Sequence, residues 1–89
     1  MIEQNTTIIN KLGLHARAAA KLVTEASKFT AEINVKRNDQ TVNGKSIMGV
    51  MMLAAAKGCE IELIINGEDE QQAMQSLLEL IANRFGEAE

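Results

Sequence analysis

Two kinds of apolar spacing alternate along this chain, and this alternation limits the possible folds more than any other feature. In residues 31–36, every second position is apolar, which is typical of a strand with one buried face. In residues 16–28, apolar positions recur at the three- and four-residue spacing of a helix. These positions are Ala16, Ala19, Ala20, Val23 and Ala26. Because strand and helix patterns follow one another throughout, the sequence predicts a mixed α+β fold.

Seven elements are predicted, in the order strand, helix, strand, strand, helix, strand, helix. Their approximate ranges are 2–9, 16–28, 31–36, 40–43, 47–57, 60–65 and 70–85. Polar residues on alternate strand positions leave one side of the sheet in water. We therefore expect an open-faced β-sandwich, with a four-stranded antiparallel sheet and three helices on one face. No stretch resembles a linker, so residues 1–89 are expected to form a single domain.

Several residues mark the expected helix ends. Ser46 is a preferred N-cap type and stands before the second helical pattern. Asp69 and Gln72 resemble a capping box at the start of the last helix. A Lys-Gly pair at 57–58 is expected to end the second helix. The apolar stripe of the last helix consists of Met74, Leu77, Leu78, Ile81 and Phe85.

Composition and charge argue against several classes of function. A net charge of -3 disfavours nucleic acid as a partner. The sequence has neither a membrane-spanning apolar run nor a signal peptide pattern, so we expect a cytoplasmic protein without membrane insertion. A single cysteine, Cys59, and a single histidine, His15, do not make up the usual zinc ligand set. We expect neither a metal nor another cofactor in a chain of 89 residues.

His15 stands at the expected entrance of the first helix. Histidine is a poor N-cap, so some other property is expected to select it there. The free N–H groups and the positive end of a helix favour an anion such as a phosphoryl group, and they disfavour imidazolium. A neutral ring keeps a nitrogen free to attack phosphorus, and Arg17 could contact phosphoryl oxygens. The spacing alone fits an ordinary, partly exposed surface histidine as well.

Two motifs carry a resemblance to a known family. The segment Gly13-Leu14-His15-Ala16-Arg17 followed by Ala19-Ala20, together with Asn43-Gly44-Lys45-Ser46-Ile47-Met48-Gly49-Val50-Met51, resembles the histidine-containing phosphocarrier (HPr) family of the bacterial phosphoenolpyruvate-dependent sugar phosphotransferase system. The similarity covers nearly the whole chain, and it implies the open-faced sandwich. It also implies that His15 accepts a phosphoryl group on Nδ1 from enzyme I and passes it to the IIA domain of a sugar permease, with Arg17 assisting.

The resemblance implies a stoichiometric carrier rather than an enzyme. We expect no carboxylate paired with His15, and the sequence has no glycine-rich phosphate loop that would suggest an independent catalyst. The family usually has proline at the position of Ala18, and alanine there also resembles proteobacterial members of the family, including the nitrogen-regulatory branch called NPr. Two alternatives therefore stay open. One is a nitrogen-branch carrier, and the other is a regulatory binding module that acts through the region of Ser46.

The second motif predicts regulation and docking. The resemblance implies phosphorylation of Ser46 by HPr kinase, at the positive end of the second helix. The apolar residues after Ser46 are too many to point inward from one short helix, and flexible methionines suit a surface that meets several partners. We expect a monomer in which enzyme I and IIA domains dock in turn on one patch. The predicted patch consists of Leu14, Ala20, Ile47, Met48 and Met51.

Overall fold

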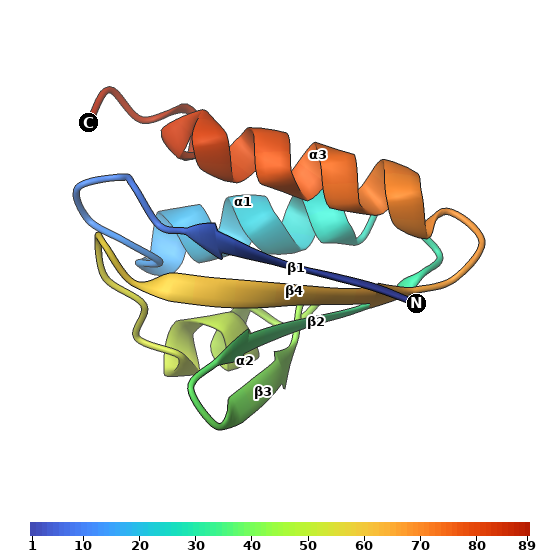
Figure 1. Cartoon of the computed structure of the whole chain (residues 1–89). Coiled ribbons are helices and arrows are strands. Elements are labelled where there is room, and N and C mark those ends of the chain that lie inside the picture. Colours follow the sequence, from blue (N-terminus) through green and yellow to red (C-terminus); the bar gives the residue numbers. More distant parts are fainter.

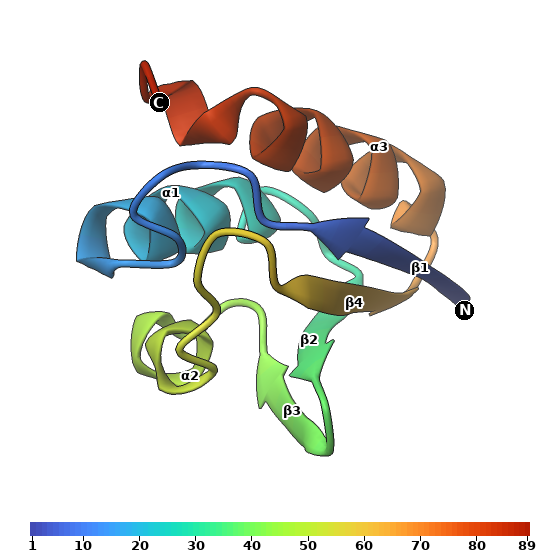
Figure 2. The same cartoon turned by 60° about the vertical axis from the view of Figure 1, so that its left-hand side comes forward.

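The structure, a computed structural model, describes residues 1–89 and has the predicted element order. Its elements are β1 (Ile2–Thr7), α1 (Ala16–Ala26), β2 (Glu32–Arg37), β3 (Gln40–Asn43), α2 (Ile47–Met52), β4 (Glu60–Asn66) and α3 (Glu70–Ala82), followed by a short 3-10 turn, Arg84–Gly86. Helices α1 and α3 lie side by side over the sheet, and α2 packs against α1 and β3 (Figure 1; Figure 2). None of these helices combines the length and the apolar character needed to span a membrane.

The four strands form one antiparallel sheet in the order β1-β4-β2-β3. The apolar residues of β2 and β4 meet across the ladder, where Ile33 is opposite Ile65 and Val35 is opposite Leu63. These four side chains are at most 1% exposed, while the residues that alternate with them are half-buried or exposed. This burial pattern confirms the predicted open-faced sandwich. The prediction succeeds because the two-residue period assigns one face of each strand to the helices.

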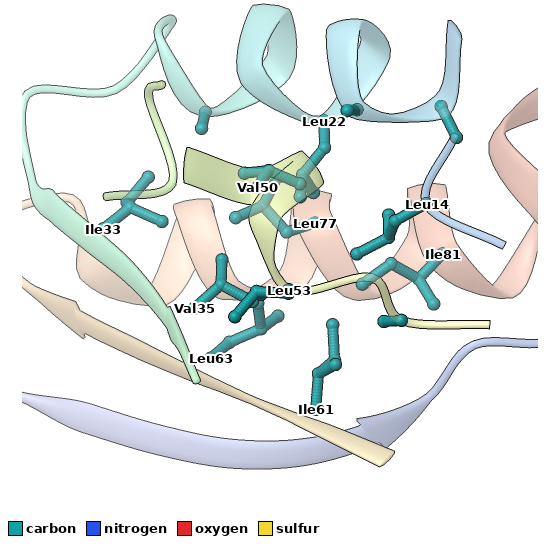
Figure 3. Packing of buried hydrophobic residues seen from close by; sticks show 14 of the residues in the cluster. Leu14, Leu22, Ile33, Val35, Val50, Leu53, Ile61, Leu63, Leu77 and Ile81 are labelled. Carbon is teal, nitrogen blue, oxygen red and sulfur yellow. The ribbon is translucent and has the colours of Figure 1, made fainter. Parts of the chain in front are cut away.

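The core contains 20 buried apolar residues, many of which are seen in Figure 3. Helix α1 buries only part of the predicted stripe, since Ala19 and Ala26 are buried as expected and the other three residues are not. Ala16 is exposed and Ala20 and Val23 are only half-buried, whereas Ala18 and Leu22 are buried. Five closely spaced alanines carry little information about the phase of the helix. The largest apolar side chain, Leu22, sets that phase because it has the most apolar surface to bury.

Helix α2 ends earlier than predicted. It stops at Met52, and Ala54 then takes a left-handed conformation with φ 51°. Leu53 turns into the core at 2% exposure, and Ala55 follows it at 3%. The prediction that the helix continues to Lys57 is wrong, because the chain instead forms a loop that reaches back toward the segment before α1. In that loop the Ala55 carbonyl accepts a hydrogen bond from the Leu14 N–H at 2.9 Å.

The start of α3 also differs from the prediction. Asp69 is the N-cap residue but makes no side-chain cap, so the predicted capping box is wrong. Its carboxylate accepts hydrogen bonds from the N–H groups of Thr30 and Ala31, each at 2.9 Å, and these bonds lower its pKa. Asp69 therefore joins the start of α3 to the connection between α1 and β2.

The chain leaves α3 at Ala82, and Phe85 lies beyond the helix rather than on its stripe. Arg84 and Phe85 both have φ 55°, a left-handed conformation that costs about 1–2 kcal/mol per residue. Phe85 is 1% exposed, and burying such a side chain contributes about 1.5–3 kcal/mol. The burial offsets much of the strain, and the turn directs residues 87–89 back toward α1.

Candidate functional site

His15 is the N-cap residue of α1, as the sequence predicts. Its backbone is extended, with φ -73° and ψ 178°, and its carbonyl accepts the first helical hydrogen bond from the Ala19 N–H at 2.8 Å. Its side chain makes no cap hydrogen bond. Gly13 makes this approach to the helix possible. It has φ +68°, and a Cβ at this position would lie 2.5 Å from the Ala55 carbonyl oxygen.

Three backbone N–H groups at the start of α1 have no acceptor within the protein. They belong to Ala16, Arg17 and Ala18, the first helical residues. Together with the helix dipole, such groups form a ready site for an anion. Ala18 adds an N–H that a proline at this position would lack. Ala16 and Arg17 are exposed while Ala18 is buried, so the site can offer the first two N–H groups to an anionic group carried next to His15.

The His15 side chain is 28% exposed, and its Nδ1 makes no hydrogen bond in the structure. The ring opens onto a surface depression of about 660 Å³, which Lys11 and Arg17 also line. Arg17 is exposed and forms no ion pair or hydrogen bond, so its guanidinium is free to meet an incoming anion. No group of three or more His, Cys, Asp or Glu residues is arranged to hold a metal ion.

The site contains a carboxylate that the sequence does not predict. Glu87 Oε2 lies 2.6 Å from His15 Nε2, so the expectation of no carboxylate beside the histidine is wrong. The bond to His15, and then a second bond to Asn10, lower the pKa of Glu87. The two residues of this pair are 72 positions apart, and no motif spacing links them. The only sequence signal is indirect: an apolar Phe85 after the last helix requires a turn that brings the following acidic residues toward the core.

Residues 84–89 form a C-terminal strap over the site. The strap is anchored by the buried Phe85, whose carbonyl accepts a hydrogen bond from Lys21 Nζ at 2.6 Å. Farther along, the Lys11 N–H donates to the Glu89 carbonyl at 2.9 Å, and Lys11 Nζ lies 3.5 Å from Glu89 Oε2. Contacts at both ends thus hold the segment that carries Glu87 against the loop before α1.

Ser46 occupies the corresponding place at the start of α2. Its Oγ accepts a hydrogen bond from the Gly49 N–H at 3.1 Å, and its carbonyl accepts one from the Val50 N–H at 3.0 Å. The predicted N-cap is confirmed. Ser46 is half-buried, so its hydroxyl oxygen is near the surface while it serves the helix.

The predicted docking patch is only partly exposed. Ile47, Met48 and Met51 are 43%, 71% and 38% exposed, and Met52, which the predicted patch leaves out, is 64% exposed. Ala20 is half-buried. Leu14 does not belong to this surface, because it is 5% exposed and lies among the core side chains in Figure 3. Its backbone is held by Ala55, so its side chain turns inward while the next side chain, His15, faces solvent.

Comparisons with known proteins agree on one family. Residues 2–83 match the family described as PTS HPr component phosphorylation site. The phosphocarrier protein HPr of Cupriavidus necator is 58% identical over 89 residues, with full coverage of both chains. A crystal structure of HPr from Thermoanaerobacter tengcongensis superposes with a TM-score of 0.96 at 45% identity and covers both chains fully. A Bacillus anthracis HPr structure gives a TM-score of 0.87 at 38% identity, covering 90% of this chain and 95% of that one. The chain therefore belongs to the HPr family of phosphocarrier proteins.

Proposed function

We propose that this chain carries phosphoryl groups in the phosphoenolpyruvate-dependent sugar phosphotransferase system, and that the relay operates in the cytoplasm. In this proposal His15 accepts the group from phosphorylated enzyme I and passes it to the IIA domain of a sugar permease. The observation that carries the proposal is the start of α1, where a half-exposed imidazole with an unbonded Nδ1 stands beside three unpaired N–H groups.

The chemistry follows from this arrangement. The Nδ1 lone pair attacks phosphorus, a bond forms between Nδ1 and phosphorus, and the bond from phosphorus to the donor's nitrogen breaks. The N–H groups of Ala16 and Arg17 donate to the phosphoryl oxygens, and the Arg17 guanidinium adds a charge-assisted contact. Transfer to the acceptor is the same step with the carrier as donor. The chain is therefore a stoichiometric intermediate that turns over no small molecule of its own.

Docking is proposed on the exposed apolar surface of α2. Ile47, Met48, Met51 and Met52 supply flexible apolar contacts, and α2 packs directly against α1, which carries His15. Enzyme I and IIA domains would use this surface in turn, with Ala20 at its edge. Leu14 takes no part, because it is buried. A surface shared by successive partners has to stay free between encounters, so we expect the carrier to be a monomer.

Ser46 is proposed as a regulatory phosphorylation site for HPr kinase. Its Oγ already lies beside the Gly49 N–H, at the positive end of α2, so the fold can tolerate a dianion there. The added charge would lie on the proposed docking surface and would disfavour partners with acidic rims. Phosphorylation at Ser46 is therefore expected to slow the arrival of phosphoryl groups at His15.

A nitrogen-branch role is the second candidate, and the observation in its favour is the buried Ala18 in place of the proline usual in the family. The test is incubation with phosphoenolpyruvate and either enzyme I or its nitrogen-branch counterpart. We expect an acid-labile phosphoryl group on the wild type and none on His15→Ala. Faster transfer from the nitrogen-branch enzyme would assign the chain to that branch. An acid-stable product, or no product with either enzyme, would contradict the carrier role.

A further inference from the structure

We propose that Glu87 is a positioning residue that selects which nitrogen of His15 takes the phosphoryl group. This inference deepens the proposed function and rests on it. The imidazole has two nitrogens that can attack phosphorus, and the start of α1 alone does not distinguish them. The contact with the C-terminal strap does, because it engages Nε2 and leaves Nδ1 without a partner.

The contact specifies the position of a proton. Hydrogen bonds from His15 and Asn10 lower the pKa of Glu87, so its carboxylate is ionised at neutral pH and can only accept hydrogen bonds. At 2.6 Å from Glu87 Oε2, the Nε2 atom must then carry the ring proton and donate it. In the neutral ring the lone pair therefore resides on Nδ1. The carboxylate also covers Nε2 sterically, so a phosphoryl donor meets only the other nitrogen.

The carboxylate is itself held in place. Asn10 Nδ2 donates to Glu87 Oε1 at 3.0 Å and to the Gly13 carbonyl at 2.8 Å. Asn10 is fully buried, so this amide is a fixed part of the loop that leads to His15. The buried Phe85 and the bond from Lys21 hold the strap from the other side. Glu87 is thus oriented before any phosphoryl group arrives, as a positioning group requires.

Charge favours the same nitrogen. When Nδ1 bonds to phosphorus and Nε2 keeps its proton, the ring becomes a cation. Glu87 faces the protonated side of this ring, so it stabilises the positive charge that develops during the transfer. Attack by Nε2 would instead require the ring to leave the carboxylate and would place the phosphoryl group against it.

A chemical donor tests this without any partner protein. Phosphoramidate transfers its phosphoryl group to imidazole nitrogen, and its own nitrogen leaves as ammonia. The wild type, Glu87→Ala, Glu87→Asp and Glu89→Gln would be treated with phosphoramidate, and the two isomers of phosphohistidine would be resolved by phosphorus and nitrogen NMR. Glu89→Gln is the matched control, since it changes a carboxylate of the same strap that does not contact His15. It removes only an exposed ion pair and keeps the main-chain bond from Lys11 that anchors the strap.

We expect only the Nδ1 isomer in the wild type and in Glu89→Gln. In Glu87→Ala the Nε2 isomer should rise to at least about a tenth of the product, and Glu87→Asp should partly restore the selection. A single Nδ1 isomer in Glu87→Ala would overturn the inference, and so would a mixture in Glu89→Gln equal to that in Glu87→Ala. Failure of enzyme I and its nitrogen-branch counterpart to phosphorylate the wild type would reject the proposed function. The isomer ratios would still decide the role of Glu87.

Discussion

The starts of α1 and α2 use their N-cap residues in opposite ways. Ser46 directs its hydroxyl oxygen to the Gly49 N–H and so completes its own helix. His15 caps nothing with its side chain and leaves the N–H groups of Ala16–Ala18 unpaired. Both residues are proposed to carry a phosphoryl group. One helix start is therefore finished by the protein, while the other is left open for a ligand.

This difference separates a structural start from a functional one. An N-cap hydrogen bond typically contributes about 1 kcal/mol, and α1 gives up that contribution at His15. What it gains is a set of donors beside a nucleophilic nitrogen. At α2, a phosphoryl group on Ser46 would replace a cap that already exists, so its main consequence is the charge it adds to the surface.

Replacing His15 by serine would make the start of α1 resemble that of α2, and it is the change with the largest expected effect. The His15→Ser variant should lose acid-labile phosphorylation entirely, because no imidazole nitrogen remains. Serine can cap the helix with its side chain, so the free energy of unfolding should stay the same or rise by up to about 1 kcal/mol. Phosphorylation assays and denaturant unfolding would measure both effects. Acid-labile phosphate on this variant would show that the acceptor is another residue.

Replacing Arg17 tests whether phosphoryl acceptance at the start of α1 also depends on a nearby cation. Arg17→Ala should lower the rate of phosphoryl acceptance by about 10- to 100-fold, since a hydrogen bond to a charged group contributes about 1.5–3 kcal/mol. Its stability should hardly change, because Arg17 makes no ion pair or hydrogen bond in the structure. Single-turnover transfer from phosphorylated enzyme I is the measurement, and Lys11→Ala is a control at the same depression. An unchanged rate in Arg17→Ala would remove this residue from the site.

A negative charge at Ser46, at the start of α2, should slow phosphoryl transfer to His15 at the start of α1. Ser46→Asp keeps a good N-cap and adds a negative charge near the proposed docking surface. We expect slower acceptance from enzyme I, by about tenfold at low salt, with the difference shrinking as salt screens the charge. Ser46→Asn is the neutral control with similar capping ability. Equal rates for the two variants would argue that Ser46 lies outside the contact region.

Removing the Ser46 cap should lower stability without changing phosphoryl transfer to His15. Ser46→Ala is expected to lower the free energy of unfolding by about 1 kcal/mol, because the Gly49 N–H loses its acceptor. Phosphoryl acceptance by His15 should stay at the wild-type rate. Urea denaturation and single-turnover transfer measure the two quantities. A loss of phosphoryl transfer without a loss of stability would contradict the structural role assigned to the start of α2.

The start of α3 extends the comparison of helix starts to the effect of pH on stability. The N–H groups of Thr30 and Ala31 lower the pKa of Asp69 in the folded chain below its usual value of 3.8. A depressed folded-state pKa means that this stabilisation is present above about pH 4 and is lost as the pH falls through the folded-state pKa. Asp69→Asn should therefore show a smaller loss of stability than the wild type on acidification below pH 4. Thermal unfolding at pH 6 and pH 2.5 measures the difference, and parallel pH profiles would contradict it.

The sequence predicts the sheet well and the helix ends less well, for physical reasons. In β2 and β4 the two-residue period assigns Ile33 and Leu63 to the core without further information. The end of α2 depends on Ala54, a residue with no intrinsic preference for a left-handed conformation, so local patterns do not reveal it. The burial of Leu14 follows from its backbone bond to Ala55, which is a long-range contact.

The residues of the candidate site also differ in whether local sequence patterns predict them. His15, Arg17 and Ser46 lie in local motifs, and the structure places both His15 and Ser46 at helix starts, as expected. Glu87 reaches His15 only because α3 ends, Phe85 is buried and the strap turns back. Residues brought together by the course of the whole chain leave no spacing signal in a single sequence. The part of the site contributed by the strap therefore required the structure.

The most direct test of the central claim is amide NMR of the wild type before and after phosphorylation by enzyme I and phosphoenolpyruvate. If the open start of α1 receives the phosphoryl group, the N–H signals of Ala16 and Arg17 should move strongly downfield, because these groups gain a charged acceptor. The Gly49 N–H, already bonded to Ser46, should stay in place. Phosphorylation of His15 that leaves the Ala16 and Arg17 signals unmoved would contradict the claim.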